Sequence, residues 1–86
     1  MDIQIARVTN FYDKVGVAVI EILNQPLSVG DTVRIKGIQT DFVQVVSVLQ
    51  VENVKVDSVE VGEICALHVQ STVQAGDMIY LQSKPS

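Results

Sequence analysis

The sequence predicts an all-β domain built as a small barrel or sandwich, and three observations support this prediction. Valine contributes 17 and isoleucine 8 of the 86 residues, and β-branched side chains fit a pleated sheet better than a helix. No long segment keeps the 3.6-residue period of a helix, whereas turn signals recur about every 8–12 residues. A chain of this length forms a single domain, which we expect to span residues 1–86, with a barrel over residues 2–82 and a polar tail over residues 83–86.

The first three predicted strands are separated by turns. Residues 2–11 alternate apolar and polar side chains, and a slip in this alternation indicates a β-bulge. Residues 15–23 are apolar on both faces, so both faces should be covered over part of the strand. Pro26 follows and ends the strand, because proline cannot donate to a β-ladder. Residues 32–36 alternate cleanly, with the apolar side chains directed inward.

The second half of the chain continues the pattern with three more strands. Residues 41–51 form a long fourth strand with apolar residues on both faces, and Glu52-Asn53 is a turn signal. Residues 55–60 alternate polar residues with valine. Residues 64–69 give the fifth strand and residues 78–81 the last. The predicted total is six strands.

A glycine followed by an acidic residue occurs three times, each time just before a predicted strand. The pairs are Gly30-Asp31, Gly62-Glu63 and Gly76-Asp77. Glycine tolerates the left-handed conformation that a tight turn needs, and a carboxylate after it can accept hydrogen bonds from turn amides. We therefore expect these six residues to form structural turns.

The glycine–acid pairs and the strands between them resemble domain II of the translational GTPases, typified by elongation factor Tu and initiation factor two. The segments that carry the likeness are Gly16-Val17-Ala18-Val19, Leu27 to Ile35, Val46-Ser47-Val48-Leu49-Gln50, Val59 to Leu67 and Ala75 to Tyr80. The segment from Lys36-Gly37 to Thr40-Asp41-Phe42 and Gln44 is similar to the small stand-alone translation elongation factor-like proteins. Ala66 departs from the family pattern, which has glycine there, so a slightly altered backbone approach is expected.

This resemblance implies both a fold and a role. The fold would be a closed six-stranded antiparallel Greek-key β-barrel of the translation-protein domain II type. The role would be that of a binding module without catalytic residues, because the barrel is an accessory binding domain in that family. A related barrel is also appended to collagenase-like peptidases.

Charge and cysteine content indicate which compartment and which classes of partner to expect. The net charge of −4 gives no general attraction to nucleic acid or to anionic membranes. The single cysteine, Cys65, cannot form an internal disulfide, which fits a reducing compartment. No signal-peptide pattern and no long apolar run is present in the sequence. We therefore expect a cytoplasmic protein without a membrane partner.

The sequence also lacks the usual signatures of catalysis. It has no phosphate-binding loop of the form GxxxxGK(S/T), so neither GTP binding nor hydrolysis is expected. Cys65 and His68 are three residues apart in a predicted strand and should point to opposite faces, which excludes a shared metal or nucleophilic site. The acidic residues are expected to be solvated surface groups. We predict no catalytic residue, no metal and no cofactor.

Two groups of residues are candidates for partner contacts. Arg34 and Lys36 lie on one face of a predicted strand and could contact RNA or another partner, although two cations alone bind phosphates weakly. Val43, Val45 and Leu49 belong to a strand with apolar residues on both faces, so some of them should be exposed as an apolar interface.

Two functional interpretations are compatible with these sequence features. In the first, the protein is a non-catalytic binding module related to translation factors, contacting a protein, RNA or the ribosome. In the second, it is an accessory or self-associating scaffold domain for a separately encoded enzyme, such as a protein of the collagenase-like peptidase family. A homo-oligomer is compatible with either interpretation.

Overall fold

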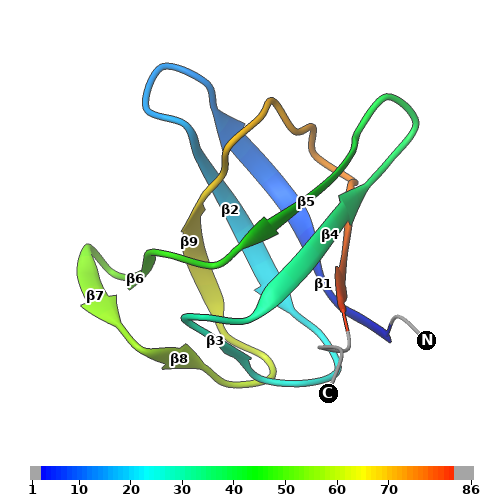
Figure 1. Ribbon diagram of the computed structural model, residues 1–86. Helices are drawn as coiled ribbons and strands as arrows, with labels where there is room; N and C mark the ends of the chain where they lie inside the picture. The colour runs from blue at the N-terminus through cyan, green and yellow to red at the C-terminus, as the bar shows by residue number, and fades with distance from the viewer. Residues whose placement is uncertain (1–2, 83–86) are drawn as a thin grey trace.

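The computed structural model describes residues 3–82, which contain ten β-strands joined by turns and loops (Figure 1). The strands are β1 (Ile3–Tyr12), β2 (Val17–Ile22), β3 (Leu27–Ser28), β4 (Thr32–Lys36), β5 (Asp41–Val45), β6 (Leu49–Val51), β7 (Val54–Val56), β8 (Ser58–Val59), β9 (Ile64–His68) and β10 (Met78–Leu81). The predicted all-β class is confirmed. Within residues 3–82 no helix has the length and apolar character needed to cross a membrane. Residues 1–2 and the predicted polar tail, residues 83–86, lie outside the described part of the chain.

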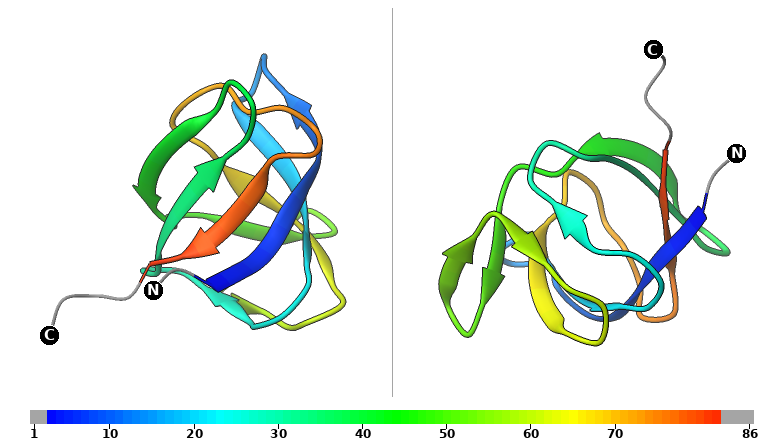
Figure 2. Two further views of the ribbon diagram at one scale, coloured as in Figure 1. Left: turned by 90° about the vertical axis from the view of Figure 1, so that its right-hand side faces the viewer. Right: turned by 90° about the horizontal axis from the view of Figure 1, so that it is seen from below.

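The strands form two antiparallel sheets. Eight of them are hydrogen-bonded in the order β5-β4-β10-β1-β2-β9-β6-β7, and β3 pairs with β8 in a small second sheet. The large sheet curls around the core as part of a barrel wall, as the view from below shows (Figure 2). Its two end strands, β5 and β7, are not paired with each other. The predicted closed six-stranded barrel is therefore wrong, and the fold is a curled half-barrel.

The predicted fourth strand, residues 41–51, is divided into two shorter strands, β5 and β6. Residues 46–48 leave the ladder between β5 and β6. The backbone of Val46 turns to the loop before β4, where its N–H donates to the carbonyl of Asp31 and its carbonyl accepts from the N–H of Gly30, both at 2.8 Å. After this break β6 pairs with β9 rather than continuing along β4. Sequence alternation alone does not reveal such a change of partner.

A side chain joins the two parts of the wall where the ladder is interrupted. Gln44 of β5 is buried, with 4% of its surface exposed. Its Nε2 donates to the carbonyl of His68, and its Oε1 accepts from the N–H of Gln70, both at 2.9 Å. We call this pair of hydrogen bonds the Gln44 bridge. It connects β5 to the end of β9 without a backbone ladder.

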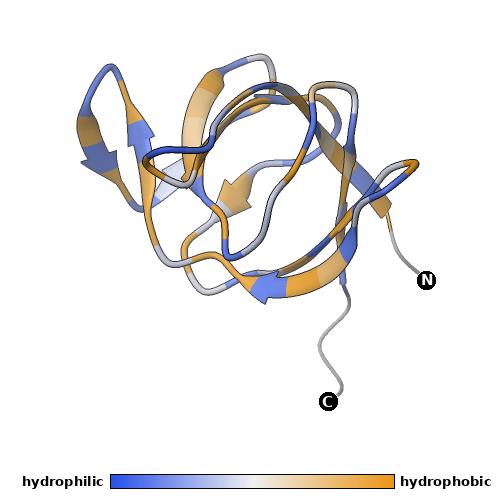
Figure 3. Cartoon of the chain, turned by 90° about the horizontal axis from the view of Figure 1, so that it is seen from above, coloured by the Kyte–Doolittle hydropathy of each residue, from blue (hydrophilic) through white to orange (hydrophobic). Residues whose placement is uncertain are grey.

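The core is formed by alternate side chains of the curled sheet. Ala18, Ile20 and Ile22 of β2 are buried, and so are Val33 and Ile35 of β4. Polar residues are interspersed with the apolar ones along the strands, as the hydropathy colours show (Figure 3). Successive side chains of a strand point to opposite sides of the sheet. The buried side chains therefore all lie on one face, which is the inner face of the curled sheet.

The longest strand, β1, lies in the middle of the sheet between β10 and β2. Its register shifts between Gln4 and Ala6 against β10 and between Val8 and Asn10 against β2, which confirms the predicted bulge. Bulges increase the local twist and help a sheet to curl. At the start of β1, Ile3 pairs with Leu81 at the end of β10. The two ends of the described chain therefore lie side by side (Figure 1).

One four-residue turn is used three times, at residues 28–31, 60–63 and 74–77. Its third residue is glycine with a φ of 97°, 89° and 97°, respectively, a conformation that other residues seldom adopt. The acidic fourth residue accepts a hydrogen bond from the N–H of the first residue at 2.9–3.0 Å. Its own N–H donates to the carbonyl of the first residue at 3.0–3.2 Å. The backbone and the carboxylate therefore close the turn together.

Candidate binding surfaces

Arg34 and Lys36 lie on the outer face of β4. Arg34 is opposite Val43 of β5 and Tyr80 of β10, and Lys36 is exposed. Nε and Nη2 of Arg34 donate to the two carboxylate oxygens of Asp41, each at 2.8 Å. This bidentate contact engages the guanidinium within the domain, so a phosphate would have to compete with Asp41 for it.

The same contact changes the acidity of Asp41. The hydrogen bond from Arg34 lowers the pKa of the Asp41 carboxyl below its ordinary value. Desolvation opposes this effect in part, and the charges of Arg34 and Lys36 add to the lowering. The carboxylate is therefore ionised at neutral pH, and the two basic residues do not form an isolated positive patch.

The predicted apolar interface is divided by the break after β5. Val43 and Val45 are 47% and 52% exposed on the outer face. Leu49 is 1% exposed and packs in the core. The strand leaves the ladder at residues 46–48, so the alternation does not continue from β5 into β6. Val43 and Val45 thus lie beside Arg34 on the surface, whereas Leu49 belongs to the interior.

A groove opens where β6 and β9 separate. These strands pair at only two positions, Leu49 with Leu67 and Gln50 with Ala66. Beyond Gln50 the chain turns through Glu52 and Asn53 into β7, while β9 extends away along β2. The space between them is an open groove of about 570 Å³, which we call the β6–β9 groove. It is lined by Val19, Gln50, Val51, Glu52, Asn53 and residues 62–66.

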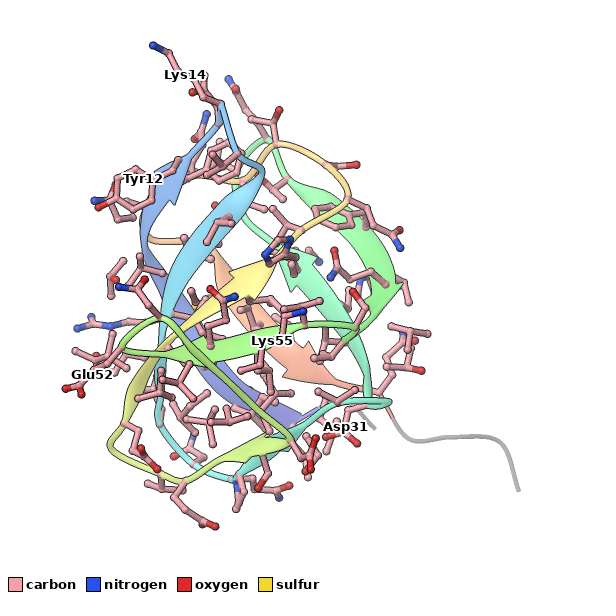
Figure 4. All side chains as sticks on the ribbon, turned by 90° about the vertical axis from the view of Figure 1, so that its left-hand side faces the viewer. Tyr12, Lys14, Asp31, Glu52 and Lys55 are labelled. Atoms are coloured by element: carbon pink, nitrogen blue, oxygen red, sulfur yellow. The ribbon has the colours of Figure 1, made fainter. Side chains whose placement is uncertain are left out.

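The hairpin that forms one wall of this groove has a tight two-residue turn. Glu52 and Asn53 have φ values of 51° and 66°, and positive φ at both central residues is typical of the type I′ turn that matches strand twist. The turn holds Glu52 at the tip of the hairpin (Figure 4). The opposite wall begins at Glu63, whose Oε1 accepts from the N–H of Glu60 at 3.0 Å.

The lining of the groove combines apolar and polar residues. Val19 and Ala66 are opposite each other on β2 and β9 and are half-buried. Ile64, two residues before Ala66 on the same face, is 58% exposed. The lining includes Glu52 and Glu63 but no lysine or arginine. The β6–β9 groove therefore offers apolar contacts together with two acidic residues.

Cys65 also borders this groove, but its side chain is buried in the core cluster, with 3% exposed. Burial raises the pKa of the Cys65 thiol to about 12, and the nearby charge of Glu63 contributes to the same direction. The thiol is therefore protonated at neutral pH and is a poor nucleophile. His68 is exposed, so the two side chains lie on opposite faces of β9. In residues 3–82 no group of three or more histidine, cysteine, aspartate or glutamate residues is arranged to hold a metal ion.

The β6–β9 groove was not predicted from the sequence. Its turn at Glu52-Asn53 is visible in the sequence, but the separation of β6 from β9 is a tertiary feature. A weak signal is Ile64, an exposed branched apolar residue on the outward face of its strand.

Comparison with known proteins finds a sequence similarity to a protein described as a protease and a structural similarity to a domain described as part of a U32 peptidase. No family model matches it. A protein of Methanocaldococcus jannaschii, described as an uncharacterized protease, is 40% identical over 80 residues, which cover 92% of this chain and 19% of the relative. The chain thus spans about a fifth of the length of that relative. The C-terminal domain of a Geobacillus thermoleovorans protein described as a U32 peptidase has the same fold in two crystal structures. The first structure has a TM-score of 0.86 and covers 93% of this chain and 92% of its own. The second, a selenomethionine variant, has a TM-score of 0.84 and covers 90% of this chain and 96% of its own. The sequence identity is 19% in both cases.

These findings correct the resemblance to translation factors. The relatives are a protease and the C-terminal domain of a U32 peptidase, not domain II of a translational GTPase or an elongation factor-like protein. The misassignment has a physical reason. The glycine–acid turns that suggested the family are a local device for closing a tight turn, and such a device is useful in any small β-domain.

Proposed function

We propose that this chain is a non-catalytic binding domain that serves as an accessory part of a U32 peptidase-family protein. The observation that carries the proposal is the alignment itself. It covers 92% of this chain but 19% of the protease, so the similarity is confined to a segment of domain size. The match in shape to a U32 peptidase C-terminal domain, with a TM-score of 0.86, supports the same assignment.

The chemistry of the described residues favours binding over catalysis. A peptidase needs an activated nucleophile, a metal or a pair of catalytic carboxylates. The one cysteine is buried and protonated, since the pKa of Cys65 is raised to about 12. The β6–β9 groove and the outer face with Val43 and Val45 instead offer surfaces for a partner. We assign the outer face to contact with the larger, catalytic part of such a protein.

Reconstitution tests this proposal. The M. jannaschii protease without its aligned 80-residue segment would be mixed with this chain, and complex formation followed by sedimentation velocity. We expect a one-to-one complex that Val43→Asp weakens. Val15→Asp is the matched control, because Val15 is also an exposed valine but lies on the β1–β2 turn.

Three results would argue against the proposal. The first is the absence of a complex at concentrations where both proteins are soluble. The second is hydrolysis of fluorescent casein by this chain alone. If the chain instead sediments as a dimer that Val43→Asp dissociates, it is a self-associating scaffold and the accessory role is replaced.

A further inference from the structure

At the β6–β9 groove, Ile64 is the one residue of β9 that faces the β6 side beyond the last β6–β9 pair. On the side of β9 that faces β2, Ile64 lies opposite Glu21. Toward β6, the pairing of β9 stops at Ala66. An edge of this kind can accept an additional strand.

The direction of the backbone groups at Ile64 follows from the antiparallel ladder. The N–H of His68 donates to the carbonyl of Val48, so His68 presents its backbone groups to the β6 side. Residues at intervals of two along a strand present these groups to the same side. Ala66 and Ile64 therefore face that side too. Ala66 has Gln50 of β6 as its neighbour on that side. Ile64 has no paired residue of β6 there and faces the β6–β9 groove instead.

The side chains around this edge determine what could bind there. The groove volume of about 570 Å³ is within the range of ligand sites, which is roughly 300–1,000 Å³. Val19, Ala66 and the exposed Ile64 offer apolar contacts. Glu52 on the hairpin and Glu63 on the opposite wall contribute negative charge, and no basic residue of the lining neutralises it.

We infer that the β6–β9 groove binds an extended, basic segment of a partner protein as an added β-strand beside Ile64. Backbone hydrogen bonds to Ile64 supply affinity, as in other cases of strand addition. Alternate apolar side chains of the segment contact Val19 and Ala66, and its lysine or arginine residues approach Glu52 and Glu63. This inference rests on the proposed binding role and names the chemistry of one partner segment.

The test uses synthetic peptides and the intact domain. The probe is a six-residue peptide of alternating lysine and valine, capped at both ends, titrated into ¹⁵N-labelled protein. We expect NMR shift changes at Ile64 and at Gln50–Asn53, and slower hydrogen exchange of the Ile64 amide. A peptide with glutamate in place of lysine should bind more weakly. A lysine–valine peptide N-methylated at alternate backbone nitrogens should not bind, because it cannot add as a strand.

A pair of protein variants separates the charge of the groove from the charge of the whole domain. Glu52→Lys should weaken binding of the lysine peptide about three- to tenfold, the change expected when one surface attraction becomes a repulsion. Asp13→Lys makes the same change in net charge on the β1–β2 turn, away from the groove, and should have little effect.

Several outcomes would overturn the inference. They are equal binding of the N-methylated peptide, equal binding of the glutamate peptide, or no binding of any probe at millimolar concentration. Because the reconstituted complex with the truncated protease is measured separately, a negative peptide result alongside an intact complex would refute the groove assignment and leave the accessory role standing.

Discussion

We expect the Gln44 bridge to stabilise the open side of the barrel, and a single substitution of this neutral side chain tests the expectation. Gln44→Met keeps a side chain of similar length but removes both hydrogen bonds, from Nε2 to the carbonyl of His68 and from the N–H of Gln70 to Oε1. The substituted side chain would remain buried, because Gln44 itself is 4% exposed. The variant therefore tests the polar contacts with little change in packing.

The expected loss can be estimated from these two contacts. An intramolecular hydrogen bond contributes about 0.5–1.5 kcal/mol net, so losing two should cost roughly 1–3 kcal/mol. His68 and Gln70 are exposed residues, so water can replace part of what the side chain supplied, and we expect about 2 kcal/mol. For a domain of this size each kcal/mol shifts the melting temperature by about 4–8 °C.

Urea unfolding followed by circular dichroism measures the change in free energy of unfolding, and hydrogen exchange of the Gln70 amide reports the bridge itself. Gln39→Met is the matched control, since Gln39 is exposed on the β4–β5 turn and should lose less than about 0.5 kcal/mol. Gln44→Glu keeps the acceptor for Gln70 but faces the His68 carbonyl with a carboxylate, so it should also be destabilised. If Gln44→Met unfolds at the wild-type urea concentration and Gln70 exchanges no faster, the bridge does not stabilise the fold and the reasoning is wrong.

Three further predictions concern packing and acidity. Gly37→Ala would place a Cβ on the Asp77 carboxylate and should cost about 1–3 kcal/mol in a urea titration; a wild-type midpoint would contradict this. Because the pKa of Cys65 is raised to about 12, the unfolded thiol ionises first as the pH rises. The free energy of unfolding should therefore fall between about pH 9 and 12, by up to about 1.4 kcal/mol per pH unit more in the wild type than in Cys65→Ala. Equal pH dependence of the two proteins would exclude this. Since Arg34 lowers the pKa of Asp41, the ion pair stabilises the fold above the unfolded pKa and is lost as the pH falls through the folded pKa. An NMR titration of Asp41 should therefore move to higher pH in Arg34→Gln, and an unchanged midpoint would refute the assignment.

Local features of the fold were accessible from the sequence because their causes are local. The alternation at residues 32–36 is a property of neighbouring residues, and the slip in alternation near the start of β1 is visible in the same way. In the glycine–acid turns, both the backbone conformation and the carboxylate acceptor belong to the same four residues. Such features can be recognised wherever the short pattern occurs, which is also why they were misleading about the family.

The features that could not be predicted from the sequence depend on distant contacts. Val46 bonds with the turn at residues 30–31, the predicted strand 41–51 is divided between two partners, β4 and β9, and Leu49 is buried. The β6–β9 groove follows from the same rearrangement, since β6 reaches β9 at only two positions. Alternation describes which side of a strand a residue occupies, but not which strand will pair with it.

The pairing of Ile3 with Leu81 has a consequence for how the domain can be combined with other proteins. The chain enters and leaves the described fold at neighbouring points in the middle of the large sheet, on the side away from the β6–β7 hairpin (Figures 1 and 2). Domains with adjacent ends can be appended to a longer polypeptide, or inserted into one, without distortion of their cores. A tether at this position would lie away from the β6–β9 groove, so that covalent attachment would leave the groove accessible.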